Sequence, residues 1–180
     1  MKPLLLLDMD GTIRKPKSAS KFINTPEDQM PINGTIQAVR HFHKKNYLII
    51  GCTNQGGVGA GHKSLDDCIK EQQITLKIFP EISKILFCPD MDGSRLAVVY
   101  PSFCSKLLER EKIDYADFSS FRKPSPGMLE YAIQTHDVDT SQILFVGDRP
   151  EDQQAAEAAG IKFCPAEVWR NQFCPGEDDF

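Results

Sequence analysis

Short runs of consecutive apolar residues recur along the chain. The first run is Leu4–Leu7, and similar runs cover residues 47–50, 85–87 and 143–146; residues 161–163, with two apolar residues around a lysine, are a shorter candidate. Apolar runs of this length, without alternation, are typical of strands that are buried on both faces of a parallel sheet. The pattern therefore predicts five short buried strands.

Segments with helical periodicity lie between these runs. Apolar residues recur every three or four positions within 36–42, 65–76 and 128–133, and the Ala-rich segment 151–159 stops at Gly160. Glycine is common just past the end of a helix. Strands that alternate with helices indicate an α/β fold with a doubly wound, mainly parallel, Rossmann-like sheet. Such a sheet has a crevice at the carboxyl ends of its strands, where the strand order reverses.

Two segments show no clear periodicity. We interpret residues 14–33 as an ordered loop, and residues 89–122 as an insertion that contains a helix near 102–111. The length of 180 residues favours one domain that spans residues 1–180.

Composition narrows the class of protein. A hydrophobic fraction of 41% and a charged fraction of 26% are those of an ordinary globular chain. The net charge of −4 argues against general affinity for nucleic acid but leaves a local basic groove open. No apolar run approaches the roughly 20 residues of a membrane span, and the opening run is too short for a signal peptide. We expect a cytoplasmic protein with no membrane partner, whose six cysteines are free thiols.

Two carboxylates follow the first predicted strand directly. Asp8 and Asp10 lie two positions apart, and Gly11 allows the chain to curl so that both can face one centre. One carboxylate could then attack phosphorus while the other handles the leaving-group proton. Taken alone, the segment is just as well explained as an Asp-rich turn.

Polar groups also follow the second strand and precede the third helical segment. Thr53 and Asn54 supply a hydroxyl and an amide, and the glycines after them let backbone N–H groups approach an anion. Arg122 and Lys123 form a basic pair, and a lysine near a phosphate would offset the charge of two aspartates. Taken singly, a ligand-free loop and a solvated basic pair are the commoner interpretations.

Four charged residues open the helix after the fourth strand. Asp148, Arg149 and Asp152 lie there, together with Glu151. The acidic residues could cap the helix and complement its dipole, or they could bind Mg²⁺, which prefers a few carboxylates plus water. All of these polar segments fall at strand ends or helix starts. Together they supply a nucleophile, a proton donor, a cation and a metal ligand, which phosphoryl transfer requires.

The motifs Asp8-Met-Asp-Gly-Thr12, Thr53-Asn54, Lys123 and Gly147-Asp148 with Asp152 resemble those of the haloacid dehalogenase (HAD) superfamily, in the family's order. They span nearly the whole chain. Their short separations are similar to those of the capless subclass (subclass III). The resemblance implies a Mg²⁺-dependent phosphomonoester hydrolase that passes through an aspartyl-phosphate.

Longer stretches resemble three groups within that superfamily. Residues 53–58, 122–128 and 147–155 are similar to histidinol-phosphate phosphatases, heptose-bisphosphate phosphatases and the 3′-phosphatase domain of polynucleotide kinase-phosphatases. Residues 13–22, with a Lys-Ser pair and a phenylalanine, resemble the last group. A small phosphorylated metabolite, either a sugar phosphate or an amino-alcohol phosphate, is the favoured substrate. A nucleic-acid 3′-phosphate is the alternative, and a non-catalytic regulatory domain is the outside alternative.

The resemblance implies a role for each motif residue. Asp8 would be the nucleophile, and Asp10 the general acid and base. The implied Mg²⁺ ligands are the Asp8 carboxylate, the Asp10 backbone carbonyl and Asp148. The residues implied to contact phosphoryl oxygens or the rest of the substrate, with Asp152 in support, are Thr53, Asn54, Lys123, Arg122 and Arg149.

Two departures from the resembling groups change the expectations. The bisphosphate phosphatases often carry a zinc loop with a C-x-H start, but Asp90 stands at the histidine position after Cys88, so we expect no zinc. Ala60 stands where two of the groups often place an arginine. The basic residues that could substitute for that arginine are Arg14, Lys15, His62 and Lys63.

Overall fold

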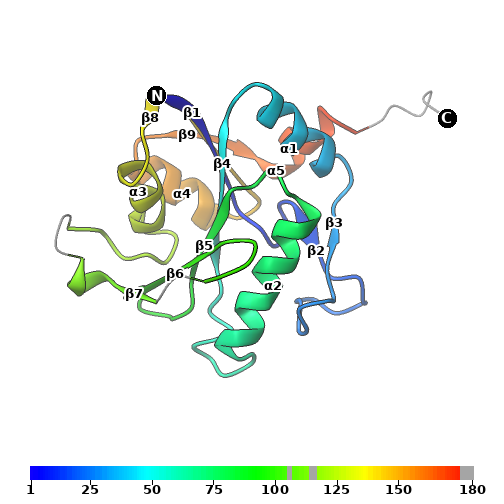
Figure 1. The fold of residues 1–180 in the computed structure, drawn as a ribbon, viewed down its shortest axis with the longest axis vertical. Coiled ribbons are helices and arrows are strands. Elements are labelled where there is room, and N and C mark those ends of the chain that lie inside the picture. The colour runs from blue at the N-terminus through cyan, green and yellow to red at the C-terminus, as the bar shows by residue number, and fades with distance from the viewer. Residues whose placement is uncertain (105–106, 114–116, 175–180) are drawn as a thin grey trace.

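A computed structural model describes residues 1–104, 107–113 and 117–174 and places a seven-stranded sheet at the centre (Figure 1). Its strands are β1 (Lys2–Leu7), β4 (Leu48–Asn54), β5 (Lys84–Cys88), β6 (Arg95–Val99), β7 (Leu108–Glu109), β8 (Val138–Gly147) and β9 (Lys162–Pro165). Their order is β7-β6-β5-β4-β1-β8-β9. The five predicted strands are all present, and they pair in parallel as expected.

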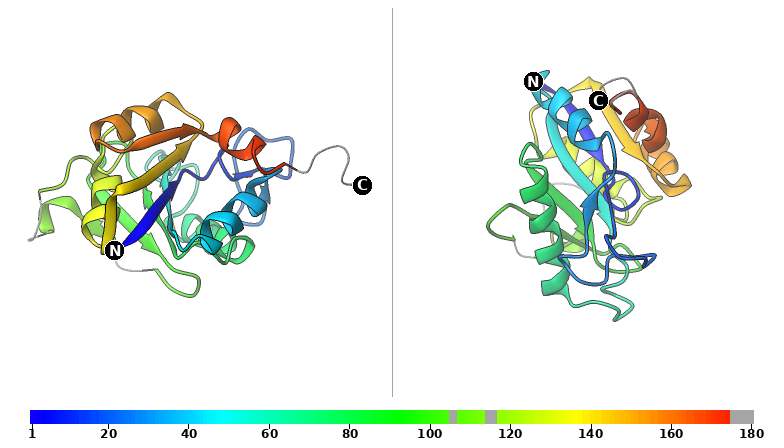
Figure 2. Two further views of the ribbon diagram at one scale, coloured as in Figure 1. Left: turned by 90° about the horizontal axis from the view of Figure 1, so that it is seen from above. Right: turned by 90° about the vertical axis from the view of Figure 1, so that its right-hand side faces the viewer.

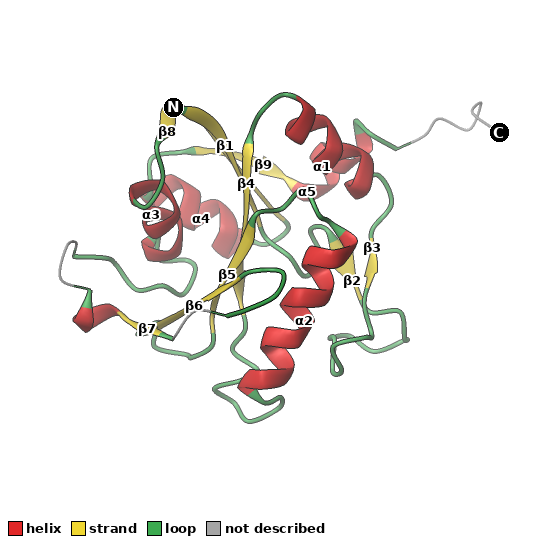
Figure 3. Cartoon of the chain, in the orientation of Figure 1, coloured by secondary structure: helices red, strands yellow, loops and turns green. Residues whose placement is uncertain are grey.

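Helices cover both faces of the sheet (Figures 2 and 3). They are α1 (Thr35–Lys44), α2 (Leu65–Ile78), α3 (Gly127–Gln134), α4 (Pro150–Ala158) and α5 (Ala166–Asn171). Leu4 and Leu6 of β1 pack in one core with α3 and α4, while Leu5 and Leu7 pack in a second core with α1, α2 and α5. Because alternate strand residues face opposite sides, this double burial requires an unbroken apolar run.

The order of the strands reverses at β1. The chain runs from β1 to β4 and β5 on one side, then returns past β1 to β8 and β9 on the other. In the register, Leu7 lies opposite Gly51 of β4 and Val146 of β8. The residues that follow β1, β4 and β8 therefore meet at one point, where the crevice of a doubly wound sheet is expected. None of the helices in the described ranges is long and apolar enough to cross a membrane.

The segment 89–122 differs from the prediction. Instead of a helix near 102–111, the described residues form β6 and β7, which extend the sheet in antiparallel fashion, and a short 3₁₀ helix, η1 (Arg110–Lys112); residues 105–106 lie outside the described part. Residues 96–99 are a buried apolar run of the same kind as the predicted strands, and the sequence interpretation overlooked it. Helix α5 was overlooked as well.

The segment 14–33 is mostly a loop, as predicted. It carries one small antiparallel hairpin of β2 (Arg14–Lys15) and β3 (Met30–Pro31). Together with α1, this hairpin fills the connection between β1 and β4.

Candidate active site

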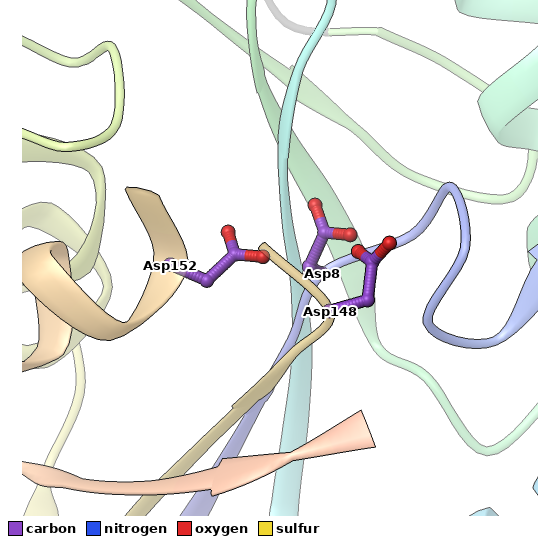
Figure 4. A group of neighbouring side chains, drawn as sticks. All are labelled: Asp8, Asp148 and Asp152. Carbon is purple, nitrogen blue, oxygen red and sulfur yellow. The ribbon is translucent and has the colours of Figure 1, made fainter. Parts of the chain in front are cut away.

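Three carboxylates face one another at the switch point of the sheet (Figure 4). Asp8 follows β1, Asp148 follows β8, and Asp152 lies in the first turn of α4; one oxygen from each lies within 4.8 Å of the others. The parallel register places Asp8 beside β8, and its backbone N–H donates to the Val146 carbonyl at 2.9 Å. Asp152 also caps α4, because its Oδ2 accepts from the Arg149 backbone N–H at 3.1 Å.

Lys123 neutralises part of this acidic cluster. Its Nζ lies 2.7 Å from Asp8 Oδ1 and 2.6 Å from Asp152 Oδ1, and it donates to the Cys52 carbonyl at 2.9 Å. Burial by itself would lower the pKa of Lys123, but the Asp8 and Asp152 carboxylates outweigh it and raise the pKa above its usual value. The ammonium group is therefore charged whenever either carboxylate is ionised.

Asp8 is almost fully buried, with an exposed fraction of 6%. Burial raises the pKa of its carboxyl to about 7, and the nearby Lys123 charge opposes that shift only in part. The Thr12 hydroxyl lies 3.1 Å from Asp8 Oδ2 and 3.2 Å from Asp148 Oδ1, so it can donate to either carboxylate. A further positive charge at this point would favour the ionised form of Asp8.

Asp10 points to a different set of partners. Its Oδ1 accepts from Arg14 Nε at 2.8 Å, and its Oδ2 accepts from Gln55 Nε2 at 2.8 Å. Its side chain is still 43% exposed. Burial would raise the pKa of Asp10, but the Arg14 charge and the two hydrogen bonds outweigh burial and lower the pKa. Arg14 and Gln55 thus fix the position of this carboxylate at the edge of the crevice.

The two polar residues at the end of β4 have distinct surroundings. Thr53 is buried, and its hydroxyl oxygen accepts from Gln55 Nε2 at 3.2 Å. The Asn54 amide bonds to the backbone of Lys123 twice: Nδ2 donates to the Lys123 carbonyl at 2.9 Å, and Oδ1 accepts from the Lys123 N–H at 3.1 Å. In this structure Asn54 therefore positions Lys123.

The two arginines lie at separate edges of the site. Arg122 is half-buried, and its Nη1 donates to the Asp90 carbonyl at 3.4 Å. A Cβ at Gly56 would lie 2.9 Å from that same nitrogen, so the guanidinium rests directly on the loop after β4. Arg149 is exposed at the start of α4 and lines a surface depression that also contains Asp148 and Arg170.

A family model described as polynucleotide kinase 3 phosphatase matches residues 3–167. The chain belongs to this family. A D-glycero-beta-D-manno-heptose-1,7-bisphosphate 7-phosphatase from Pasteurella multocida is 31% identical over 162 residues, which cover 90% of this chain and 79% of the relative. The same-named protein from Neisseria meningitidis is 28% identical over 163 residues and covers 88% of this chain and 74% of the relative.

The fold agrees with this assignment. The crystal structure of a D,D-heptose 1,7-bisphosphate phosphatase from B. bronchiseptica, complexed with magnesium and phosphate, matches with a TM-score of 0.62 at 22% identity. The match covers 98% of this chain and 89% of that one. The expectation from the motifs is confirmed: the protein is a phosphatase of the HAD superfamily.

The donor set suits a hard divalent cation. Asp8 and Asp148 offer carboxylate oxygens, which Mg²⁺ prefers. Asp152 is less available, since Lys123 and the Arg149 N–H already occupy its oxygens. At Cys88, where Asp90 stands at the expected histidine position, the thiol donates to Asp90 Oδ1 at 3.2 Å, and burial raises the pKa of the thiol to about 12.

One residue that supports this site, Arg170, was missed by sequence reasoning. Arg170 of α5 donates from Nη1 to the carbonyls of Gly11 and Thr12, at 2.8 Å each, and so holds the loop that carries Asp8 and Asp10. No motif marks Arg170. Gly11 has a φ of +87°, and a Cβ there would lie 2.3 Å from Asp148 Oδ2. The glycine is thus needed both for the turn and for the approach of Asp148.

Of the four candidates to replace the arginine expected at Ala60, Arg14 is excluded by its burial. Its side chain has no exposed surface, because it points inward and pairs with Glu71 on α2. It can therefore neither line a basic groove nor replace the arginine expected at Ala60. Lys63 is also engaged, with its Nζ 2.6 Å from Glu71 Oε2, whereas Lys15 and His62 are exposed.

Proposed function

We propose that the protein hydrolyses phosphomonoesters of small sugars, through an aspartyl-phosphate on Asp8 and with Mg²⁺ as the cofactor. The contact between Lys123 and Asp8 carries this proposal. A buried cation beside a buried carboxylate favours the ionised form of the nucleophile and can also bind the oxygens of an incoming phosphoryl group. The bound metal would supply a second positive charge, held by Asp8, the Asp10 backbone carbonyl and Asp148.

The reaction has two displacements. In the first, a carboxylate oxygen of Asp8 bonds to phosphorus as the ester P–O bond breaks, and Asp10 gives a proton to the departing oxygen. In the second, Asp10 takes a proton from water, whose oxygen attacks the same phosphorus and releases inorganic phosphate and the free Asp8 carboxylate. Thr53 and Lys123 hold the phosphoryl oxygens, and Asn54 contributes by keeping Lys123 in place.

The names of the relatives support a sugar phosphate as the substrate. Those reported above are heptose-1,7-bisphosphate 7-phosphatases, and they align over most of this chain. The exposed Arg149 and the half-buried Arg122 are then available for the rest of the substrate. This substrate class also agrees with the net charge of −4, which gives no general attraction for a polyanion.

A nucleic-acid 3′-phosphatase is the second candidate, and the name of the matching family model favours it. Lys15, Lys17 and Lys21 are exposed on the segment after the catalytic loop, and Phe22 beside them is 59% exposed. Two features weaken this candidate. Arg14 is buried, and the loop carries its own acidic residues, since Asp28 accepts from Ser18 at 2.6 Å.

One experiment separates the two candidates. The kcat/KM for heptose 1,7-bisphosphate and other sugar phosphates is compared with that for a 3′-phosphorylated oligonucleotide, from low to physiological salt. We expect a sugar phosphate to be the better substrate, with little salt dependence. The sugar assignment is wrong if kcat/KM for the oligonucleotide is higher by about tenfold or more and falls as the salt concentration rises. In that case kcat/KM should also fall when Lys15, Lys17 and Lys21 are neutralised together.

A further inference from the structure

Five side chains form a closed hydrogen-bonded ring behind the catalytic loop, which we call the Asp10 ring. Arg14 donates from Nε to Asp10 Oδ1 at 2.8 Å and from Nη2 to Glu71 Oε1 at 2.6 Å. Lys63 Nζ donates to Glu71 Oε2 at 2.6 Å and to Gln55 Oε1 at 3.3 Å. Gln55 Nε2 donates to Asp10 Oδ2 at 2.8 Å and so closes the ring.

The ring is anchored in the interior and exposed at Asp10. Arg14 and Glu71 are buried, and Thr75 and Gln29 accept hydrogen bonds from the remaining Nη1 group of Arg14. Asp10, in contrast, is 43% exposed and borders the crevice. The orientation of the Arg14 guanidinium is therefore set by α2 and not by solvent, and the guanidinium passes that orientation on to Asp10.

Ion pairs of this kind contribute little to stability in general, because removing two charges from water offsets their attraction. A buried arginine with a partner on each side is well suited to another task. Glu71 holds its rigid, planar guanidinium by Nη2, and this fixes the place from which Nε donates to the Asp10 carboxylate. Donors on both oxygens of Asp10 prevent rotation of its carboxylate about the Cβ–Cγ bond.

We propose that Arg14 is a positioning residue that acts through Asp10, by holding the Asp10 carboxylate in the orientation from which it reaches the leaving oxygen. This inference rests on the proposed function, in which Asp10 exchanges a proton with that oxygen. Proton transfer requires the two heavy atoms to lie within hydrogen-bond reach, and a small misplacement slows it strongly. Glu71 and Lys63 act one step further away, by holding Arg14 and Gln55.

The test compares two substrates whose leaving groups differ in their need for a proton. An alkyl phosphate such as glycerol 3-phosphate requires a proton on its departing oxygen, whereas p-nitrophenyl phosphate releases a stable phenolate without one. We measure kcat/KM, which reports the first displacement, for both substrates. With Arg14→Lys, we expect kcat/KM to fall by about tenfold to a hundredfold for the alkyl phosphate and by less than about threefold for p-nitrophenyl phosphate.

Asp10→Asn provides the reference. It should show the same selectivity in a stronger form, and the combined variant with Arg14→Lys should be no slower than Asp10→Asn alone, since both changes act on one group. If Arg14→Lys lowers kcat/KM equally for both substrates, or if the two losses of kcat/KM add up in the combined variant, Arg14 has only a structural role. If Asp10→Asn itself lowers kcat/KM equally for both substrates, the result contradicts the proposed function, in which Asp10 gives the proton, and not only the role of Arg14.

Two further variants guard against loss of the fold. Arg14→Met combined with Glu71→Gln removes both buried charges together and should give the same selectivity, even if Arg14→Lys does not fold. Leu76 lies on the same helix as Glu71 but outside the ring. If Leu76→Ala lowers kcat/KM at all, it should do so to the same extent for both substrates. Selective loss of the alkyl phosphate in Leu76→Ala would overturn the inference.

Discussion

Lys123 Nζ lies 2.7 Å from Asp8 Oδ1, although the two residues are 115 positions apart. The contact joins the end of β1 to the loop before α3, and Asn54 holds that loop by its backbone. Because Lys123 also pairs with Asp152, one cation serves two buried carboxylates. This shared cation underlies several of the expectations that follow.

Asp8→Asn should abolish turnover and leave the fold intact. The amide keeps the shape of the side chain but is not a nucleophile. The comparison uses the initial rate with the best substrate and the circular dichroism spectrum of each protein. Retention of more than a few per cent of activity in a clean preparation would remove Asp8 from that role.

The stability of the metal-free protein should depend on pH through Asp8. Its pKa is about 7 in the folded protein and 3.8 ordinarily, so the folded state keeps a proton that the unfolded state has released. The contribution of this group is fully present below about pH 4 and is lost as pH rises towards 7. Relative to the native chain, Asp8→Asn should therefore gain on the order of 1–3 kcal/mol between these limits, measured by urea unfolding in EDTA. If the two proteins differ by the same free energy of unfolding at every pH in this range, the pKa of Asp8 is not raised.

Chelation should stop activity, and Mg²⁺ should restore it. Asp148→Asn removes a carboxylate from the site, so we expect it to raise the Mg²⁺ concentration for half-maximal activity by at least about tenfold. Glu151→Gln, at an exposed neighbouring position in the same helix start, is the matched control and should leave that concentration unchanged. Elemental analysis should find no stoichiometric zinc, and zinc bound at Cys88 would contradict our interpretation of that loop.

Lys123→Met should cost activity and stability together. It leaves the buried carboxylates of Asp8 and Asp152 without their shared cation, which costs about 3–5 kcal/mol. Adding Asp152→Asn removes one of the two charges and should recover part of the stability but none of the activity. Recovery of turnover in the double variant would show that Lys123 has only a structural role.

Gly11→Ala and Gly61→Ala form a matched pair. Both glycines have positive φ, +87° and +75°, so each substitution costs roughly 1–2 kcal/mol of backbone strain. Only at Gly11 would the new methyl group meet Asp148, at 2.3 Å from Oδ2, whereas nothing lies within 4 Å at Gly61. We expect only Gly11→Ala to lower the affinity for Mg²⁺ and the activity. Equal effects of the two variants on Mg²⁺ affinity would disprove the steric argument.

Several site residues could be predicted because their positions follow from local pattern. Asp8, Thr53 and Asp148 each lie just after an apolar run, and parallel strands bring such positions to one edge of the sheet. The roles of other residues did not follow from pattern. No local pattern showed that the Asn54 amide bonds the backbone of Lys123, or that Arg14, one of four candidates for a substrate contact, is buried.

The sequence by itself determined the α/β architecture and the location of the site, because burial on two faces requires continuous apolar runs and strand ends carry the loops. Only the tertiary structure decided which polar groups pair. Arg14 meets Glu71 across 57 positions, and Arg170 meets Thr12 across 158. A buried polar group bonds to whichever partner the fold brings within reach, and no local pattern records that proximity. For the same reason the antiparallel pairing of β6 with β5, and of β7 with β6, became evident only in the folded chain.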